Sequence, residues 1–183
     1  MTTPKSYKGI LKHFHAKDKV IQQFMEHLPS LLESNYPFDV ALSYLFSRLE
    51  LGQNIIIYAS IRKKYKTDTR VTEVAIENWD STKDTFESRF EIVFGKPVPT
   101  AIMAAKKAAQ RVRNKVMHGK SVSEPEKRAA IAEGLDYAQS LNTLVMSELR
   151  FEPFGKITGI TGAAPAMDAS ATRFLLKGMG FNI

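Results

Sequence analysis

Apolar residues recur at spacings of three and four along most of this chain, which is the period of an amphipathic helix. The first such segment carries the set Val20, Ile21, Phe24, Met25, Leu28, Leu31 and Leu32. Pro29 lies inside this segment and is expected to kink or break it, because proline lacks a backbone donor. Residues 38–64 are dense in apolar side chains and predict a central core helix. Since no convincing strand alternation precedes residue 151, the pattern predicts an all-α fold.

Residues 71–94 also have a helical pattern, with an interruption expected at Trp79-Asp80-Ser81-Thr82, where Asp and Ser can cap a new start. A clear break follows at Gly95-Lys96-Pro97-Val98-Pro99. Thr100 is then expected to cap a helix over about 101–117, whose small apolar residues suggest close packing.

Gly119 supplies a stop for that helix, because glycine is favoured just past a helix C-terminus. Ser123 and Glu126 have the spacing of a capping box, which starts a last long helix ending near Leu149. The two helices on either side of Gly119 are therefore expected to form a helical hairpin.

Beyond Phe151 the composition changes to Gly, Ala, Thr and Pro, and Gly155 to Gly162 predict a flexible connector. Asp168 is expected to cap a short helix around Phe174, stopped by Gly178. We expect this helix to dock on its own domain, with a partner or a second copy as the alternative. The sequence thus predicts a bundle of about five to six helices over residues 1–150 and a partly irregular tail over 151–183.

Composition narrows the possible chemistry. The chain has 183 residues, of which 44% are hydrophobic and 25% charged, as expected for one globular domain. It contains no cysteine, which excludes disulfides, thiolate zinc sites and a cysteine nucleophile. No apolar run reaches the roughly 18 residues of a membrane span, and the N-terminus lacks the apolar stretch of a secretory signal. We therefore expect a cytoplasmic protein without a membrane partner. Its chemistry would come from His, Arg, carboxylates, hydroxyls or a borrowed cofactor, and we predict neither a metal nor a cofactor.

The formal charge of +7 and the pI of about 9.5 favour a polyanionic partner such as nucleic acid. One basic group surrounds Tyr65: Arg62, Lys63, Lys64, Lys66 and Arg70. A second group lies between residues 106 and 120, where no acidic residue occurs: Lys106, Lys107, Arg111, Arg113, Lys115 and Lys120. A solvated basic helix face explains either group, taken alone, equally well.

The second group encloses the segment Arg113-Asn114-Lys115-Val116-Met117-His118-Gly119, at the end of a predicted helix. This arrangement resembles the signature of the HEPN family, an Arg followed a few residues later by His, commonly with Asn directly after the Arg. The resemblance extends over about 17–149 through the number of helices, the position of the hairpin and the lack of strands. It implies a metal-independent endoribonuclease whose homodimer brings two motifs face to face.

The residue types suit that chemistry on their own account. The planar fork of Arg113 can hold a phosphodiester, and His118 can exchange a proton near neutral pH. On an ideal helix these two side chains lie about 140° apart, so they converge only if the last turn loosens or a facing surface brackets both. Asn114 and His118 are the neighbours at i and i+4 and lie away from the apolar stripe.

The endoribonuclease hypothesis assigns His118 as acid or base, Arg113 as phosphate clamp and Asn114 as orienting residue. The RNA-binding cations would be Arg111, Lys115, Lys120, Lys64 and Lys66. A toxin of a toxin–antitoxin pair, with an antitoxin protein as partner, or a phage-defence effector fits this activity.

A second hypothesis is a non-catalytic helical module that binds RNA, a nucleotide or a protein through the same surface. A third is a structural protein that assembles through its tail helix. In the simplest alternative, His118 only caps the helix C-terminus and Arg113 pairs with a carboxylate on a neighbouring helix.

Other polar residues carry weaker signals. His13 and His15 are two residues apart, a spacing that fits no helical ligand pair, and His27 lies beside an apolar face. Glu50 and Asn54 are i,i+4 partners on the central helix. We interpret them as a structural pair, with an approach to the Arg113 and His118 site as the alternative.

Overall fold

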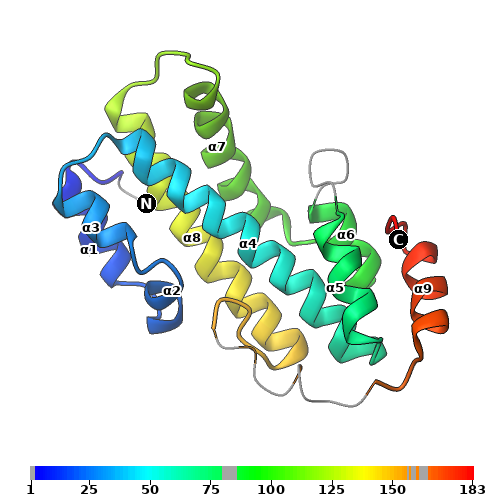
Figure 1. Ribbon diagram of the computed structural model, residues 1–183. Helices are drawn as coiled ribbons and strands as arrows, with labels where there is room; N and C mark the ends of the chain where they lie inside the picture. Colours follow the sequence, from blue (N-terminus) through cyan, green and yellow to red (C-terminus); the bar gives the residue numbers. More distant parts are fainter. Residues whose placement is uncertain (1–2, 80–85, 156, 158–159, 161–164) are drawn as a thin grey trace. The chain divides into compact units, whose positions relative to one another are not determined.

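The structure is a computed structural model that describes residues 3–79, 86–155, 157, 160 and 165–183. Within these ranges the chain is all-helical and contains no strand, which confirms the predicted fold class (Figure 1). The described helices are α1 (Tyr7–His15), α2 (Lys19–Phe24), α3 (Leu28–Glu33), α4 (Phe38–Tyr65), α5 (Thr69–Glu77), α6 (Phe86–Phe94), α7 (Thr100–Met117), α8 (Glu124–Leu149) and α9 (Ala169–Gly178). No helix among the described residues is both long and apolar enough to cross a membrane.

The contacts divide the chain into two compact units. Unit 1 comprises residues 1–51 and 99–144, and unit 2 comprises residues 52–98 and 145–183. Helices α4 and α8 each contribute residues to both units.

The described residues up to 150 form eight helices, more than the five to six expected there, mainly because the N-terminal part is subdivided. The predicted first segment is two helices, α2 and α3, and Pro29 occupies the first turn of α3, where its missing N–H costs nothing. Helix α1 was not predicted. Its hydrophobic face is short, with Ile10 and Phe14 buried, and its N-cap is Ser6, whose hydroxyl accepts from the N–H of Gly9.

Unit 1 is built on the first part of α4 and most of α8, which run in the same direction. Lys127 near the start of α8 contacts Asp39 near the start of α4 at 2.6 Å. Further along, Gly134 lies against Leu45 and Leu49, and a Cβ at this glycine would meet Leu45 Cδ2 at 2.6 Å. Glycine thus allows the two helices to approach closely. Buried apolar residues of α8 complete this core: Ile131, Leu135, Ala138 and Leu141.

Helix α7 runs antiparallel to α4. Met117 at its end lies near Ser43, and Arg113 lies near Glu50, one to two turns further along α4. The predicted apolar stripe of α7 is only partly covered, because Ala109 is fully buried whereas Val112 and Val116 are half-buried.

The predicted start of α7 was wrong by one position. Its N-cap is Pro99 and the helix begins at Thr100, so the threonine hydroxyl does not cap it. The predicted capping box of α8 is confirmed: Glu126 Oε2 accepts from the backbone N–H of Ser123 at 3.0 Å and from its hydroxyl at 2.6 Å.

In unit 2, α9 packs against α5. The tail helix therefore docks on its own chain, as expected. The predicted cap at Asp168 is confirmed, since its side chain accepts from the N–H of Ala171. The proposed interruption at Asp80-Ser81-Thr82 lies outside the described residues. The same holds for most of the predicted connector, of which Gly155, Ile157 and Ile160 are described.

Candidate active site at the end of helix α7

Helix α7 ends in a Schellman turn that places His118 at the surface. The N–H of Gly119 donates to the carbonyl of Val116 at 3.0 Å, and the N–H of Lys120 donates to that of Lys115 at 2.9 Å. Gly119 has φ +66°, a left-handed conformation that costs glycine little. His118 is the C-cap residue, the first position past the regular helix.

The imidazole of His118 is exposed, and none of the described residues forms a hydrogen bond or ion pair with it. Only its backbone N–H is engaged, donating to the carbonyl of Asn114 at 3.1 Å. With ψ of 16°, His118 leaves the helical path, so the last turn does loosen at this residue. The ring is therefore open to solvent and to any molecule that approaches the end of α7.

Arg113 is held on the surface of α4. Its Nη1 donates to Oδ1 of Asn114 at 3.3 Å, and its Nη2 lies 3.7 Å from Oε1 of Glu50. The guanidinium carbon lies 6.0 Å from the centre of the Phe46 ring. The side chain retains 33% of its exposure, while its Nε is buried without a partner among the described residues. Arg113 is thus oriented by α4 but partly accessible.

The described contacts bring Arg113 and Asn114 together and leave His118 apart. Neither the guanidinium of Arg113 nor the amide of Asn114 contacts the imidazole among the interactions of the described residues. The difference between residues on the regular helix and one past its end accounts for this separation. Within one chain, the three residues form an oriented pair and a free imidazole.

The contact of Glu50 with Arg113 was not the preferred prediction from the sequence. We interpreted Glu50 as the i,i+4 partner of Asn54, but its carboxylate contacts Arg113, the alternative that was left open. The signal was weak because it depends on the antiparallel packing of α4 and α7, which periodicity does not specify. One carboxylate thus reaches a basic segment that has none in its own sequence.

Glu126 brings a second carboxylate to this segment, at 3.9 Å from Nζ of Lys115. Hydrogen bonds from the hydroxyl and the N–H of Ser123 hold the pKa of Glu126 below its ordinary value, and the charge of Lys115 adds to this effect. Arg111 and Lys120 are exposed and have no partner among the described residues. Two of the three cations predicted at this end of α7 are therefore free.

The other two predicted RNA-binding cations belong to unit 2. Lys64 is engaged: its ammonium donates to the carbonyl of Val93 at 2.6 Å and lies 5.6 Å from the centre of the Phe94 ring. Lys66 is exposed at a positive φ of 50°, and its carbonyl accepts from the backbone of the tail.

A second histidine of unit 1 has a different environment. His13 Nε2 lies 2.8 Å from Oδ1 of Asp136, and Lys17 donates to the same oxygen. Burial raises the pKa of Asp136, but the bonds from His13 and Lys17 outweigh it and hold the pKa below its ordinary value. Burial, followed by the charge of Asp136, raises the pKa of Glu133 nearby. These residues tie α1 to α8.

His27 is exposed and lies 3.7 Å from Glu26. In the part of the chain that the structure describes, no three His, Cys, Asp or Glu side chains are grouped so that they could hold a metal ion.

Comparison of the chain with protein-family models, with curated proteins and with solved structures gives no match.

Proposed function

We propose that the chain is a metal-independent endoribonuclease of HEPN type, with Arg113, Asn114 and His118 as its catalytic residues. The observation that carries the proposal is the free, exposed imidazole of His118 at the end of α7, one turn past the oriented pair of Arg113 and Asn114. The same contacts also fit the simplest alternative, because His118 is the C-cap of α7 and Arg113 lies 3.7 Å from the carboxylate of Glu50 on the neighbouring helix α4. The roles are those that the chemistry of each side chain favours.

In the proposed reaction the 2′-oxygen of one ribose attacks the adjacent phosphorus, and the bond from phosphorus to the 5′-oxygen breaks. The 2′-hydroxyl loses its proton and the 5′-oxygen gains one, so the products are a 2′,3′-cyclic phosphate and a 5′-hydroxyl. His118 takes part in this proton transfer. Arg113 binds the phosphoryl oxygens and offsets the charge that develops on them, and Asn114 orients its guanidinium.

A homodimer with facing motifs would place the His118 of one copy near the Arg113 of the other. Two observations support this arrangement. The polar residues of the motif are separated within one chain, and α7 leaves apolar surface accessible, including Met117 with 55% exposure. A second copy packed there would cover that surface and complete both sites.

Arg111 and Lys120 would attract the RNA backbone, since both are exposed and unpaired among the described residues. A cytoplasmic toxin with an antitoxin partner, or a phage-defence effector, is the setting we propose for this activity. A non-catalytic module is the second candidate, favoured by the contact of Arg113 with Glu50, which occupies part of the proposed phosphate clamp.

The proposal is tested by incubating labelled RNA with the protein in EDTA. Wild-type protein is expected to cleave, and His118→Ala and Arg113→Ala are each expected to lose the activity. His27→Ala is the matched control for an exposed histidine, and Lys8→Ala for an exposed cation. Equal cleavage by the wild type and both motif variants, or none by any of them, contradicts the nuclease and leaves the binding module.

A further inference from the structure

Helix α9 is held at both ends by other residues of unit 2. Its first turn is fixed from inside, because the hydroxyl of Thr172 accepts from the N–H of Asp68 at 2.8 Å and Thr172 is fully buried. The backbone before it donates twice to the carbonyl of Lys66, from Ala166 at 2.9 Å and from Met167 at 3.2 Å.

Its far end is equally well held. The guanidinium of Arg89 donates to the carbonyls of Met179 and Gly180, the second at 2.7 Å, and lies 4.3 Å from the centre of the Phe181 ring. A helix anchored at both ends can present its outer side chains in a defined position.

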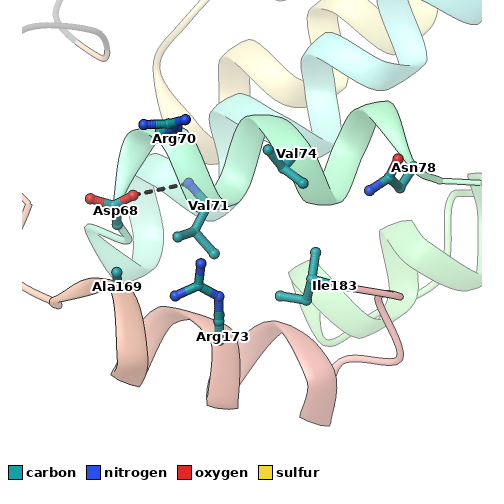
Figure 2. A pocket seen from close by; sticks show the side chains of 8 residues that line it. All are labelled: Asp68, Arg70, Val71, Val74, Asn78, Ala169, Arg173 and Ile183. Atoms are coloured by element: carbon teal, nitrogen blue, oxygen red, sulfur yellow. Dashed lines mark hydrogen bonds between the residues drawn. The ribbon is translucent and has the colours of Figure 1, made fainter.

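A cavity of about 590 Å³ lies between α5 and α9. Figure 2 shows the side chain of Arg173 rising from α9 toward Val71, while Val74, Asn78 and Ile183 lie further along the cavity. Arg70 also lines the cavity. Among the described residues neither arginine has a hydrogen-bond or ion-pair partner. The acidic residue in the lining, Asp68, already accepts the N–H of Val71 through Oδ1 at 2.9 Å.

Phe174, the next residue on α9, is 84% exposed, the highest exposure of a large hydrophobic side chain among the described residues. It lies two positions from the buried Thr172 and thus on nearly the opposite side of the helix. Lys177 is three residues further on, at a spacing that makes it a surface neighbour of Phe174, and it is exposed without a partner among the described residues. The exposed ring thus has two unpaired cations on one side of it, Lys177 and, nearer the cavity, Arg173.

We propose that this surface of α9, formed by Arg173, Phe174 and Lys177, is a binding site for single-stranded RNA, separate from the Arg113 and His118 site. The inference takes RNA as the partner from the proposed function. Phe174 stacks on an unpaired base, and Arg173 and Lys177 bind the phosphates next to that base. Unpaired cations favour an RNA over an apolar protein partner at this ring, and an accessible ring face favours an unpaired base over a duplex.

The experiment measures RNA binding by the full chain carrying His118→Ala, so that cleavage does not interfere. Fluorescence anisotropy follows a labelled single-stranded RNA of about 12 nucleotides and the duplex of the same sequence. Phe174→Leu is expected to weaken single-strand binding at least about fivefold, because it keeps an apolar side chain but removes the stacking ring. Phe174→Trp is expected to restore the affinity. Arg173→Ala is expected to lower the slope of log affinity against log salt by about 0.7.

Ile92→Ala and Lys8→Ala are matched controls for an exposed apolar residue and an exposed cation, and both are expected to keep the affinity. Equal binding by the parent, Phe174→Leu and Arg173→Ala overturns the proposal. The proposal is also overturned if Phe174→Leu lowers the oligomeric mass of the protein in solution but leaves its RNA affinity unchanged. That result assigns the ring to a contact between protein copies.

The outcome is independent of the nuclease test. Suppose that the wild-type protein cuts no RNA, but that adding Phe174→Leu to the His118→Ala chain lowers its RNA affinity. The catalytic proposal then fails and this site stands. If wild-type protein cuts RNA and both surface variants bind as the parent does, the opposite holds.

Discussion

Two histidines of unit 1 show how differently the same side chain can be used. His13 lies on α1 with 24% of its side chain exposed and shares Oδ1 of Asp136 with Lys17. His118 lies past the end of α7, is exposed, and has no side-chain partner among the described residues. Both are close to basic residues in the sequence, so local composition does not separate them.

The two histidines are distinguished by whether a carboxylate contacts the imidazole. Asp136 fixes the first imidazole between α1 and α8, which is a structural use. At the end of α7 the carboxylate of Glu50 contacts Arg113 and that of Glu126 contacts Lys115, and neither forms an ion pair with the second imidazole. A free imidazole is available for proton transfer, whereas an enclosed one contributes to stability.

The largest expected effect separates the two histidines directly. His118→Ala is expected to lower RNA cleavage by about 10²- to 10⁴-fold, the usual contribution of a general acid or base, without changing the free energy of unfolding. His13→Ala is expected to do the reverse, lowering stability while leaving cleavage per folded molecule intact. Initial cleavage rates and urea unfolding, measured on both variants, check this. Loss of cleavage in His13→Ala at full folding would reverse the assignment.

A smaller effect is expected at the partner of His13. Asp136→Asn removes the charge that Lys17 and His13 share in a partly buried site, leaving a cation with only 12% of its side chain exposed. Breaking such a pair is expected to cost about 2–3 kcal/mol of unfolding free energy. Glu33→Gln, at an exposed carboxylate, is the matched control and should change stability by less than about 0.5 kcal/mol. An unchanged stability in Asp136→Asn would mean that the cluster is not structural.

The pH dependence of stability sharpens the same point. Because the folded state holds the pKa of Asp136 below its ordinary value near 3.8, this carboxylate contributes stability that is complete above about pH 4. That contribution is lost as the pH falls through the lower, folded-state pKa. The difference in unfolding free energy between wild type and Asp136→Asn should therefore shrink from about pH 6 to below about pH 4. A constant difference over that range would contradict the assignment.

The smallest effect is expected at the pair of Arg113 and Glu50. Both side chains are partly exposed, so a double-mutant cycle with Arg113→Ala and Glu50→Gln should give a coupling of about 0.2–1 kcal/mol in stability. A coupling several times larger would mean that Arg113 is a structural anchor of α7 on α4, like Lys17 on α8, and would remove it from the catalytic set.

Periodicity and capping signals were sufficient to predict the long helices. The ends of α4 and α8, the cap of α9 at Asp168, the glycine stop after α7 and the capping box at Ser123 follow from local chemistry and are confirmed. The predicted stop of α9 was wrong by two residues, because Gly178 is the last helical residue and Gly180, with φ +83°, takes the left-handed position after the C-cap. Short helices were harder to predict from the sequence. Helix α1, for example, has only two fully buried residues and too few turns for a helical period to be evident.

The candidate site was predictable only as far as it is local in sequence. The proximity of Arg113 and Asn114 and the position of His118 next to the Gly119 turn follow from neighbouring residues. The contacts of Glu50 with Arg113 and of Asp136 with His13 do not, since they join residues far apart in the chain through the packing of different helices. Such contacts depend on helix register, which the spacing of apolar residues leaves open.

We propose that the open end of α7 performs phosphoryl transfer with a 2′-hydroxyl as nucleophile. Identifying the ends of RNA that the wild-type protein cuts in EDTA tests this proposal most directly. The predicted products carry a 2′,3′-cyclic phosphate on one fragment and a 5′-hydroxyl on the other, the second of which a polynucleotide kinase labels without prior phosphatase treatment. Fragments with a 5′-phosphate, which require water as the nucleophile, or RNA that remains intact, would contradict the account.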